Sequence, residues 1–66
     1  MGGIKMKITL KAARVNAGYS LAQAAETTEV DPSTVCRWER NGSKIPAVSC
    51  LKLCEAYGVD IKDLKL

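Results

Sequence analysis

The sequence predicts an all-α domain built from five short helices. Its 66 residues leave room for a single domain. Apolar residues recur at helical spacing in successive segments, and no segment carries a convincing strand pattern. The chain has no Phe and one Trp although 47% of its residues are hydrophobic. The core must therefore be assembled from small side chains, which suit closely packed helices.

The first helix is predicted between Thr9 and Ala17. Leu10 and Ala13 fall at helical spacing in this segment. Thr9 is a suitable N-cap because its hydroxyl can accept a hydrogen bond from a free backbone amide. Gly18 follows the segment and can end the helix in a left-handed conformation.

The second helix is predicted over residues 21–28. Ser20 and Gln23 have the spacing of a capping box, in which each side chain satisfies the backbone N–H of the other residue. Only Glu29 and Val30 separate this helix from the next one. Two helices joined by such a tight turn meet at a steep angle, so the later helix lies across the earlier one with its outer face free.

The third helix is predicted over residues 32–40. Pro32 suits the first helical position because its missing N–H costs no hydrogen bond there. Asp31 precedes it, and we expect the carboxylate to accept from the free amides of the first turn. A polar loop at residues 41–45 ends the helix.

The fourth helix is predicted to open at Pro46 and to stop at Gly58. It carries an apolar stripe at i, i+3, i+4 and i+7, made of Cys50, Leu53, Cys54 and Tyr57. Asp60 can then cap a short fifth helix, with Ile61 and Leu64 on one side.

Charge and hydropathy constrain the function only loosely. A net charge of +3 and a pI near 8.9 favour a polyanionic partner, although proteins without such a partner share these values. No apolar run approaches the roughly 18 residues needed to cross a bilayer, and no export signal is present, so we expect a cytoplasmic protein. We expect residues 1–7 to be a flexible leader before a domain at residues 8–66.

The chemistry-bearing residues favour neither an enzyme nor a metal protein. The chain has no His, no nucleophile beside a recognisable base and no glycine-rich phosphate loop. Cys36, Cys50 and Cys54 match no zinc or redox spacing, and we expect them to be reduced thiols. We therefore expect no cofactor, no metal and no small-molecule ligand.

Residues 21–39 are similar to the two-helix unit of the phage repressor and Cro type helix-turn-helix family. Ala25 matches the small residue where the two helices touch, and Val30 matches the apolar residue of the turn. Val35 and Trp38 match the inward anchors of the recognition helix. The run Leu-Cys-Glu-Ala-Tyr-Gly-Val-Asp-Ile resembles the family's last two helices, so the resemblance covers residues 8–64. It implies a compact five-helix, lambda-repressor-like DNA-binding domain with the helix-turn-helix in the second and third helices.

The resemblance implies that the third helix lies in the major groove of double-stranded DNA. The residues then expected to read bases are Pro32, Ser33, Thr34 and Arg37. Arg37 is the chief reader, because its guanidinium can donate two hydrogen bonds to O6 and N7 of guanine, worth roughly 1–3 kcal/mol of discrimination. The alternative for Arg37 is a solvated surface arginine.

Phosphate contacts are expected at the start of the second helix and after the third. Their donors are Ser20, Gln23, Arg40, Asn41, Ser43 and Lys44. Ser20 and Gln23 can also serve only as caps, and the two roles can coexist. Arg14 and Glu39 match a family pair that joins the first helix to the end of the third by a structural salt bridge.

The chain departs from the family pattern at four positions. Leu21 stands where the family often has a Gln that braces a phosphate, and Leu cannot donate. Pro32 replaces a common base-reading residue, so we expect recognition to depend on fewer direct base contacts and more on DNA shape. Glu29 stands where the turn usually has Gly, so a positive φ there would cost of order 1 kcal/mol. Ala13 stands where the family prefers Leu.

The function expected from the resemblance is that of a sequence-specific transcription regulator, a repressor of phage or prophage type. The expected partner is a near-palindromic operator, bound by a weak homodimer that assembles through the fourth and fifth helices. The residues suggested for that contact are Val59, Ile61, Leu64 and Leu66. The alternative is an antitoxin-like or regulatory module that uses the same fold to bind a protein.

Cys36 lies next to Arg37 on the third helix and has two interpretations. One is a redox switch whose oxidation weakens DNA binding, which titration of affinity against peroxide would test with Cys36→Ser as control. The other, favoured one is a small hydrophobe without redox function. Cys50 and Cys54 lie on an apolar stripe and are expected in the core.

Overall fold

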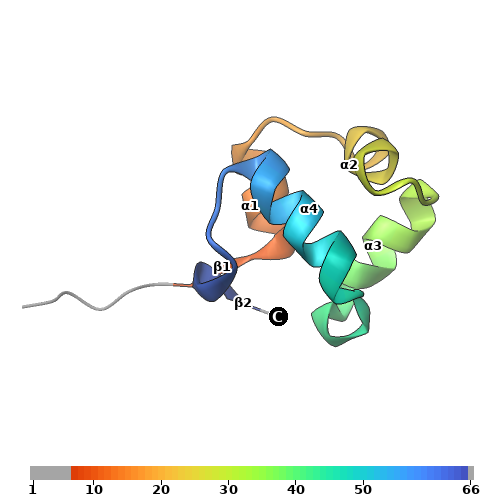
Figure 1. Cartoon of the computed structure of the whole chain (residues 1–66). Coiled ribbons are helices and arrows are strands. Elements are labelled where there is room, and N and C mark those ends of the chain that lie inside the picture. Colours follow the sequence, from red (N-terminus) through yellow and green to blue (C-terminus); the bar gives the residue numbers. More distant parts are fainter. Residues whose placement is uncertain (1–6, 66) are drawn as a thin grey trace, which may run out of the picture.

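The computed structural model describes residues 7–65 (Figure 1). Four α-helices make up most of this part of the chain: α1 (Leu10–Asn16), α2 (Leu21–Thr28), α3 (Pro32–Arg40) and α4 (Ala47–Tyr57). Two single 3₁₀ turns, η1 (Gly42–Lys44) and η2 (Ile61–Asp63), and two short strands, β1 (Ile8–Thr9) and β2 (Leu64–Lys65), complete it. The predicted all-α class holds. Of the expected leader at residues 1–7, residues 1–6 lie outside the described residues.

The predicted helix starts and ends are confirmed where local side chains or glycines fix them. The Thr9 hydroxyl accepts from the Ala12 amide at 3.1 Å, and Gly18 has a left-handed φ of 77°. The capping box at the start of α2 is complete, with both reciprocal hydrogen bonds present. Gly58 ends α4 with a φ of 74°. These ends depend on chemistry within a few residues, so the sequence alone is sufficient to predict them.

The prediction of a fifth helix is wrong. Asp60 caps the segment as expected, accepting from the Lys62 amide at 3.1 Å, but only the single turn η2 follows. Leu64 then adopts extended backbone and pairs in parallel with Ile8 as β2 joins β1. Its side chain is buried in the core, so Leu64 does not share an exposed face with Ile61. The expectation that the chain contains no strand is therefore wrong. A strand of two residues is too short to show alternating polar and apolar residues in the sequence.

The start of α3 differs from the prediction in one contact. The Asp31 side chain makes no capping hydrogen bond. Its backbone carbonyl instead accepts from the amides of Thr34 at 2.9 Å and Val35 at 3.4 Å. Pro32 occupies the first helical position as predicted and brings no N–H that needs a partner. The first turn of α3 is therefore closed by backbone hydrogen bonds alone.

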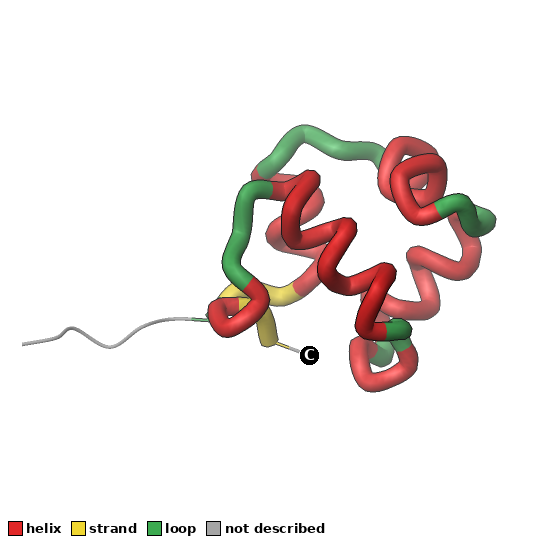
Figure 2. The backbone as a smooth tube through the Cα atoms, viewed as in Figure 1, coloured by secondary structure: helices red, strands yellow, loops and turns green. Residues whose placement is uncertain are grey.

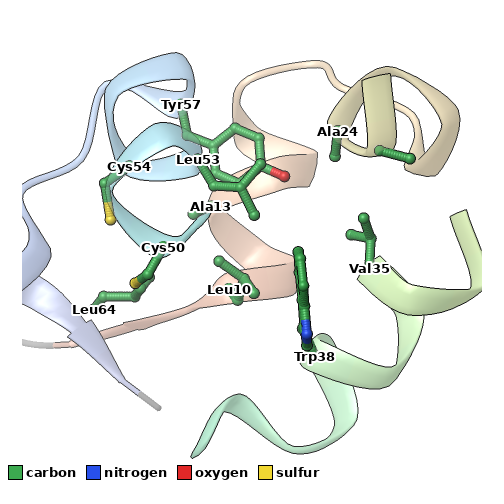
Figure 3. Close-up of a cluster of buried hydrophobic side chains, with 11 residues drawn as sticks. Leu10, Ala13, Ala24, Val35, Trp38, Cys50, Leu53, Cys54, Tyr57 and Leu64 are labelled. Carbon is green, nitrogen blue, oxygen red and sulfur yellow. The ribbon is translucent and has the colours of Figure 1, made fainter. Parts of the chain in front are cut away.

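The core lies where α4 packs against α1 and α2, with α3 closing it from the other side (Figure 2). Small side chains dominate it, as the composition predicts, and Trp38 and Tyr57 are its two large aromatic residues (Figure 3). The buried members are Leu10, Ala13, Ala24, Ala25, Val35, Trp38, Cys50, Leu53, Cys54, Tyr57 and Leu64. Because α3 contributes only two of them, most of its surface lies outside the core.

Candidate nucleic-acid interface

The turn between α2 and α3 has a left-handed residue at Glu29, with φ 59° and ψ 43°. The amides of Glu29 and Val30 donate back to carbonyls of α2, at 3.2 Å and 3.0 Å. Glu29 thus adopts the positive φ for which the family usually has Gly, at a cost of about 1 kcal/mol for a side chain with a Cβ. The turn is tightly hydrogen-bonded, and it fixes the direction in which α3 leaves α2.

The inner side of α3 is fixed by two buried anchors. Val35 is fully buried and projects from α3 toward Ala24 of α2, while Trp38 stands beside Leu10 of α1 (Figure 3). Ala24 and Ala25 are buried where α2 meets α3, and small residues there let the two helices approach closely. The orientation of α3 is therefore set by packing on one side.

Four exposed side chains follow the opposite side of α3, at positions i, i+3, i+4 and i+7. They are named here the outer row: Ser33, Cys36, Arg37 and Arg40. Pro32 is also exposed at the tip of the helix, whereas Thr34 is half-buried beside the row. Among the residues expected to read bases, Pro32, Ser33 and Arg37 are thus accessible. The reasoning from sequence left Cys36 out of this group, although counting from the two anchors would have found it.

Arg14 and Glu39 form an ion pair between α1 and the last turn of α3. Arg14 Nε lies 2.6 Å from Glu39 Oε2, and Arg14 Nη2 lies 3.4 Å from Oε1. Arg14 Nη1 also donates to the carbonyl of Tyr19 at 2.9 Å. The side chains are only 11% and 7% exposed. The hydrogen bond to Glu39 raises the pKa of Arg14 above its ordinary value. Arg14 is therefore a structural residue, bound within the protein.

The start of α2 keeps donors free for a ligand even though its cap is complete. The Ser20 hydroxyl oxygen accepts from the Gln23 amide at 3.0 Å, which leaves the hydroxyl hydrogen available. Gln23 Oε1 accepts from the Ser20 amide at 2.8 Å, which leaves the side-chain NH₂ available. Both residues are exposed. Capping and donation to a phosphate are thus compatible at these two residues.

The segment after α3 carries the remaining residues expected at phosphates. Arg40, Asn41, Ser43 and Lys44 are all exposed around the turn η1. The Ser43 hydroxyl donates to Asn41 Oδ1 at 2.7 Å. Because this bond uses the oxygen of the Asn41 amide, the NH₂ group is left to donate outward. Two cations and one free amide donor therefore lie in this short segment.

The other reactive groups lie away from this surface. Cys50 and Cys54 are buried, as expected, and burial raises the pKa of the Cys54 thiol to about 11. Tyr57 is buried, with an edge contact to Tyr19 and a hydroxyl without a hydrogen-bond partner in the described chain. Burial raises its pKa to about 12. Within residues 7–65, no group of three or more His, Cys, Asp or Glu is arranged to hold a metal ion. None of the helices found there is long and apolar enough to span a membrane.

The comparisons with known proteins identify one family. Its model, described as helix-turn-helix and of the Cro type, matches residues 10–64, which include all four helices. Searches of curated proteins and of solved structures found no significant match. The matched family consists of DNA-binding regulators that are generally not enzymes. The chain therefore belongs to the helix-turn-helix family of DNA-binding regulators that includes Cro and the phage repressors.

Proposed function

We propose that this protein is a sequence-specific transcription regulator, acting as a repressor, that places α3 in the major groove of double-stranded DNA. The observation that carries this proposal is the exposed, mainly polar outer row opposite the buried anchors Val35 and Trp38. A groove about 12 Å wide admits an α-helix, and a helix anchored along one side can offer the other side to base edges. Membership of the family supports the DNA partner.

Arg37 is the principal base reader in this proposal. Its side chain is exposed near the middle of α3, and no ion pair to it occurs among the described residues. The guanidinium is thus available for a bidentate contact to guanine, worth roughly 1–3 kcal/mol against other bases. Pro32 and Ser33, exposed at the start of α3, lie close to the bases in the same arrangement.

Phosphate contacts come from the segments before and after α3. Ser20 and Gln23 keep free donors at the start of α2, where the helix dipole also favours an anion. Arg40, Lys44 and the NH₂ group of Asn41 supply the second set, while the Ser43 hydroxyl, expected from the sequence as a further donor, instead orients the Asn41 amide. Such contacts fix the register of the protein on the duplex and make affinity fall with salt, but they do not read sequence.

A protein-binding module is the weaker candidate. Such a module would present an apolar patch on α3, whereas two of the four outer-row residues are arginines and one is serine. The large apolar side chains exposed on helices lie outside α3: Val15 of α1 is 56% exposed, and Val48 and Leu51 of α4 are 65% and 54% exposed. The chemistry of the α3 surface therefore favours DNA.

We also propose a weak homodimer that assembles on a near-palindromic site. The apolar residues available for it differ from those first expected, because Leu64 is buried and Leu66 lies outside the described residues. Ile61 is exposed, as are Val48 and Leu51 of α4. Sedimentation equilibrium should detect two protomers per duplex, and a single protomer on a palindromic site would contradict the dimer.

The test of the function is selection of binding sites from a random DNA pool at defined salt. The wild-type protein should enrich a consensus, and Arg37→Ala should lose preference at one base position of it. Lys11→Ala is the matched control, because it removes an exposed cation of α1 outside the proposed surface. The absence of any enriched site would reject the function, and an unchanged consensus with Arg37→Ala would reject the role of Arg37.

A further inference from the structure

The angular positions of residues on α3 place Cys36 as centrally on the outer side as Arg37. The centre of that side is the direction opposite the mean of the two buried anchors. At about 100° of rotation per residue, Cys36 and Arg37 each lie about 50° from this centre, and Thr34 about 110°. The exposures agree, because Cys36 is exposed and Thr34 is half-buried. A ligand that covers Arg37 from outside must therefore also cover Cys36.

The chemistry of Cys36 differs from that of its neighbours in the outer row. A free cysteine behaves as a small hydrophobe, and the other two thiols of this chain are indeed buried. Cys36 alone is exposed, between Ser33 one turn before it and Arg40 one turn after it. In the major groove, the group that matches a small apolar side chain is the C5-methyl of thymine.

We infer that the base-contacting surface includes Ser33, Cys36 and Arg37 of the outer row, and that Cys36, in place of Thr34, is a specificity-determining residue that packs against the C5-methyl of a thymine. This inference rests on the proposed function. Arg37 reads a guanine by hydrogen bonds, and Cys36, the residue directly before it, reads a neighbouring thymine by apolar contact. Thr34 faces the flank of the helix and contacts no base.

Protection of the thiol by DNA tests this placement directly. The full chain is treated with N-ethylmaleimide, alone and saturated with the duplex enriched from the random pool, and modification of each cysteine is followed by mass spectrometry. Cys36 should react readily in the free protein and at least about tenfold more slowly in the complex. Cys50 and Cys54 are buried internal controls and should react slowly in both states. Protein already modified at Cys36 should lose binding to the duplex.

The outcomes separate this inference from the function on which it rests. Saturation is measured independently by fluorescence anisotropy of a labelled duplex. If the duplex is bound and Cys36 still reacts at its free rate, the proposed function stands and the inference fails. If no enriched duplex binds the unmodified protein, both fail.

A second measurement tests the thymine contact. Each thymine of the enriched site is replaced by uracil, which removes only the C5-methyl group. One such replacement should weaken wild-type binding about threefold to fourfold, the effect of losing one buried methyl group. The same replacement should not weaken binding of Cys36→Gly, whereas Thr34→Ala, the matched control, should retain the wild-type loss. Equal losses in wild type and Cys36→Gly at every thymine would overturn the contact.

Discussion

The two sides of α3 differ in burial and in the contacts of their side chains. The inner side carries two buried anchors, Val35 and Trp38, and a nearly buried carboxylate held by Arg14. The outer row is exposed, and no hydrogen bond or ion pair fixes its side chains within the described residues. One nine-residue helix thus packs into the core on one side and leaves the other side, which we propose binds DNA, exposed. Substitutions on the inner side should change the free energy of unfolding, and those on the outer side should change DNA affinity alone.

Replacement of Trp38 should give the largest effect. Trp38→Ala removes the largest side chain of the core and should cost about 3–5 kcal/mol of unfolding free energy. A domain of 66 residues has only roughly 3–10 kcal/mol in total, so the variant should be largely unfolded by circular dichroism. Trp38→Phe, as control, should retain the fold. A cooperative urea transition in Trp38→Ala at the wild-type midpoint would show that the inner side does not hold α3.

Disruption of the ion pair should rank second. Glu39→Ala leaves the guanidinium of Arg14 without its carboxylate at a nearly buried site and should cost about 3 kcal/mol. The double variant Arg14→Met with Glu39→Leu removes both charges and should be more stable than Glu39→Ala alone, because no charge is stranded. Urea unfolding of the three proteins measures the difference. A double variant less stable than Glu39→Ala would contradict this account.

Replacement of Arg37 should affect only binding. Arg37→Ala should weaken affinity for the enriched duplex by roughly 1–3 kcal/mol, measured by anisotropy at fixed salt. Its unfolding free energy should stay within about 0.5 kcal/mol of wild type, as for other exposed substitutions. A large loss of stability would mean that the two sides of α3 are not independent.

Removal of the Tyr57 hydroxyl should give the smallest effect at neutral pH. This buried hydroxyl has no partner in the described chain, so Tyr57→Phe should leave stability unchanged or raise it by about 1 kcal/mol at pH 7. Burial raises the pKa of Tyr57 from 10.0 to about 12. Because folding favours the protonated form of Tyr57, the stability that this preference contributes is complete below pH 10 and is lost as pH rises through 12.

Urea unfolding at a series of pH values measures this loss. Tyr57→Phe should remove part of the decline between pH 10 and 12, and the part that remains includes Cys54, whose pKa burial raises from 9.0 to about 11. Identical declines in the two proteins would show that Tyr57 is not desolvated by the core.

Features fixed by local chemistry could be predicted from the sequence. Both ends of α1, the start of α2 and the end of α4 follow from caps and glycines within a few residues. The left-handed Glu29 was indicated only by the Gly that the family usually has in the turn. The Arg14–Glu39 pair, which joins distant segments, came only from the family resemblance. The family was therefore needed for the contact that no local pattern encodes.

Features that depend on distant contacts could not be predicted. The pairing of Leu64 with Ile8 joins the two ends of the described chain, and no periodicity within either segment indicates it. Asp31 is a good N-cap by type, yet the backbone closes the first turn of α3 without its side chain. For the candidate site, the decisive quantity is the angular position of each residue around the axis of α3. Val35 and Trp38 are identifiable as anchors from the sequence, and the helical positions opposite them include Cys36.

The parallel pairing of β1 with β2 has a practical consequence. It brings the first and last described residues to one place, across the molecule from α2 and from the first turn of α3 (Figure 1). Fluorophores attached at Lys7 and at Lys65 would therefore lie close together, across the molecule from the proposed DNA-binding helices. On one molecule the two would form a close donor–acceptor pair for energy transfer, and a loss of transfer would signal that β1 and β2 have separated.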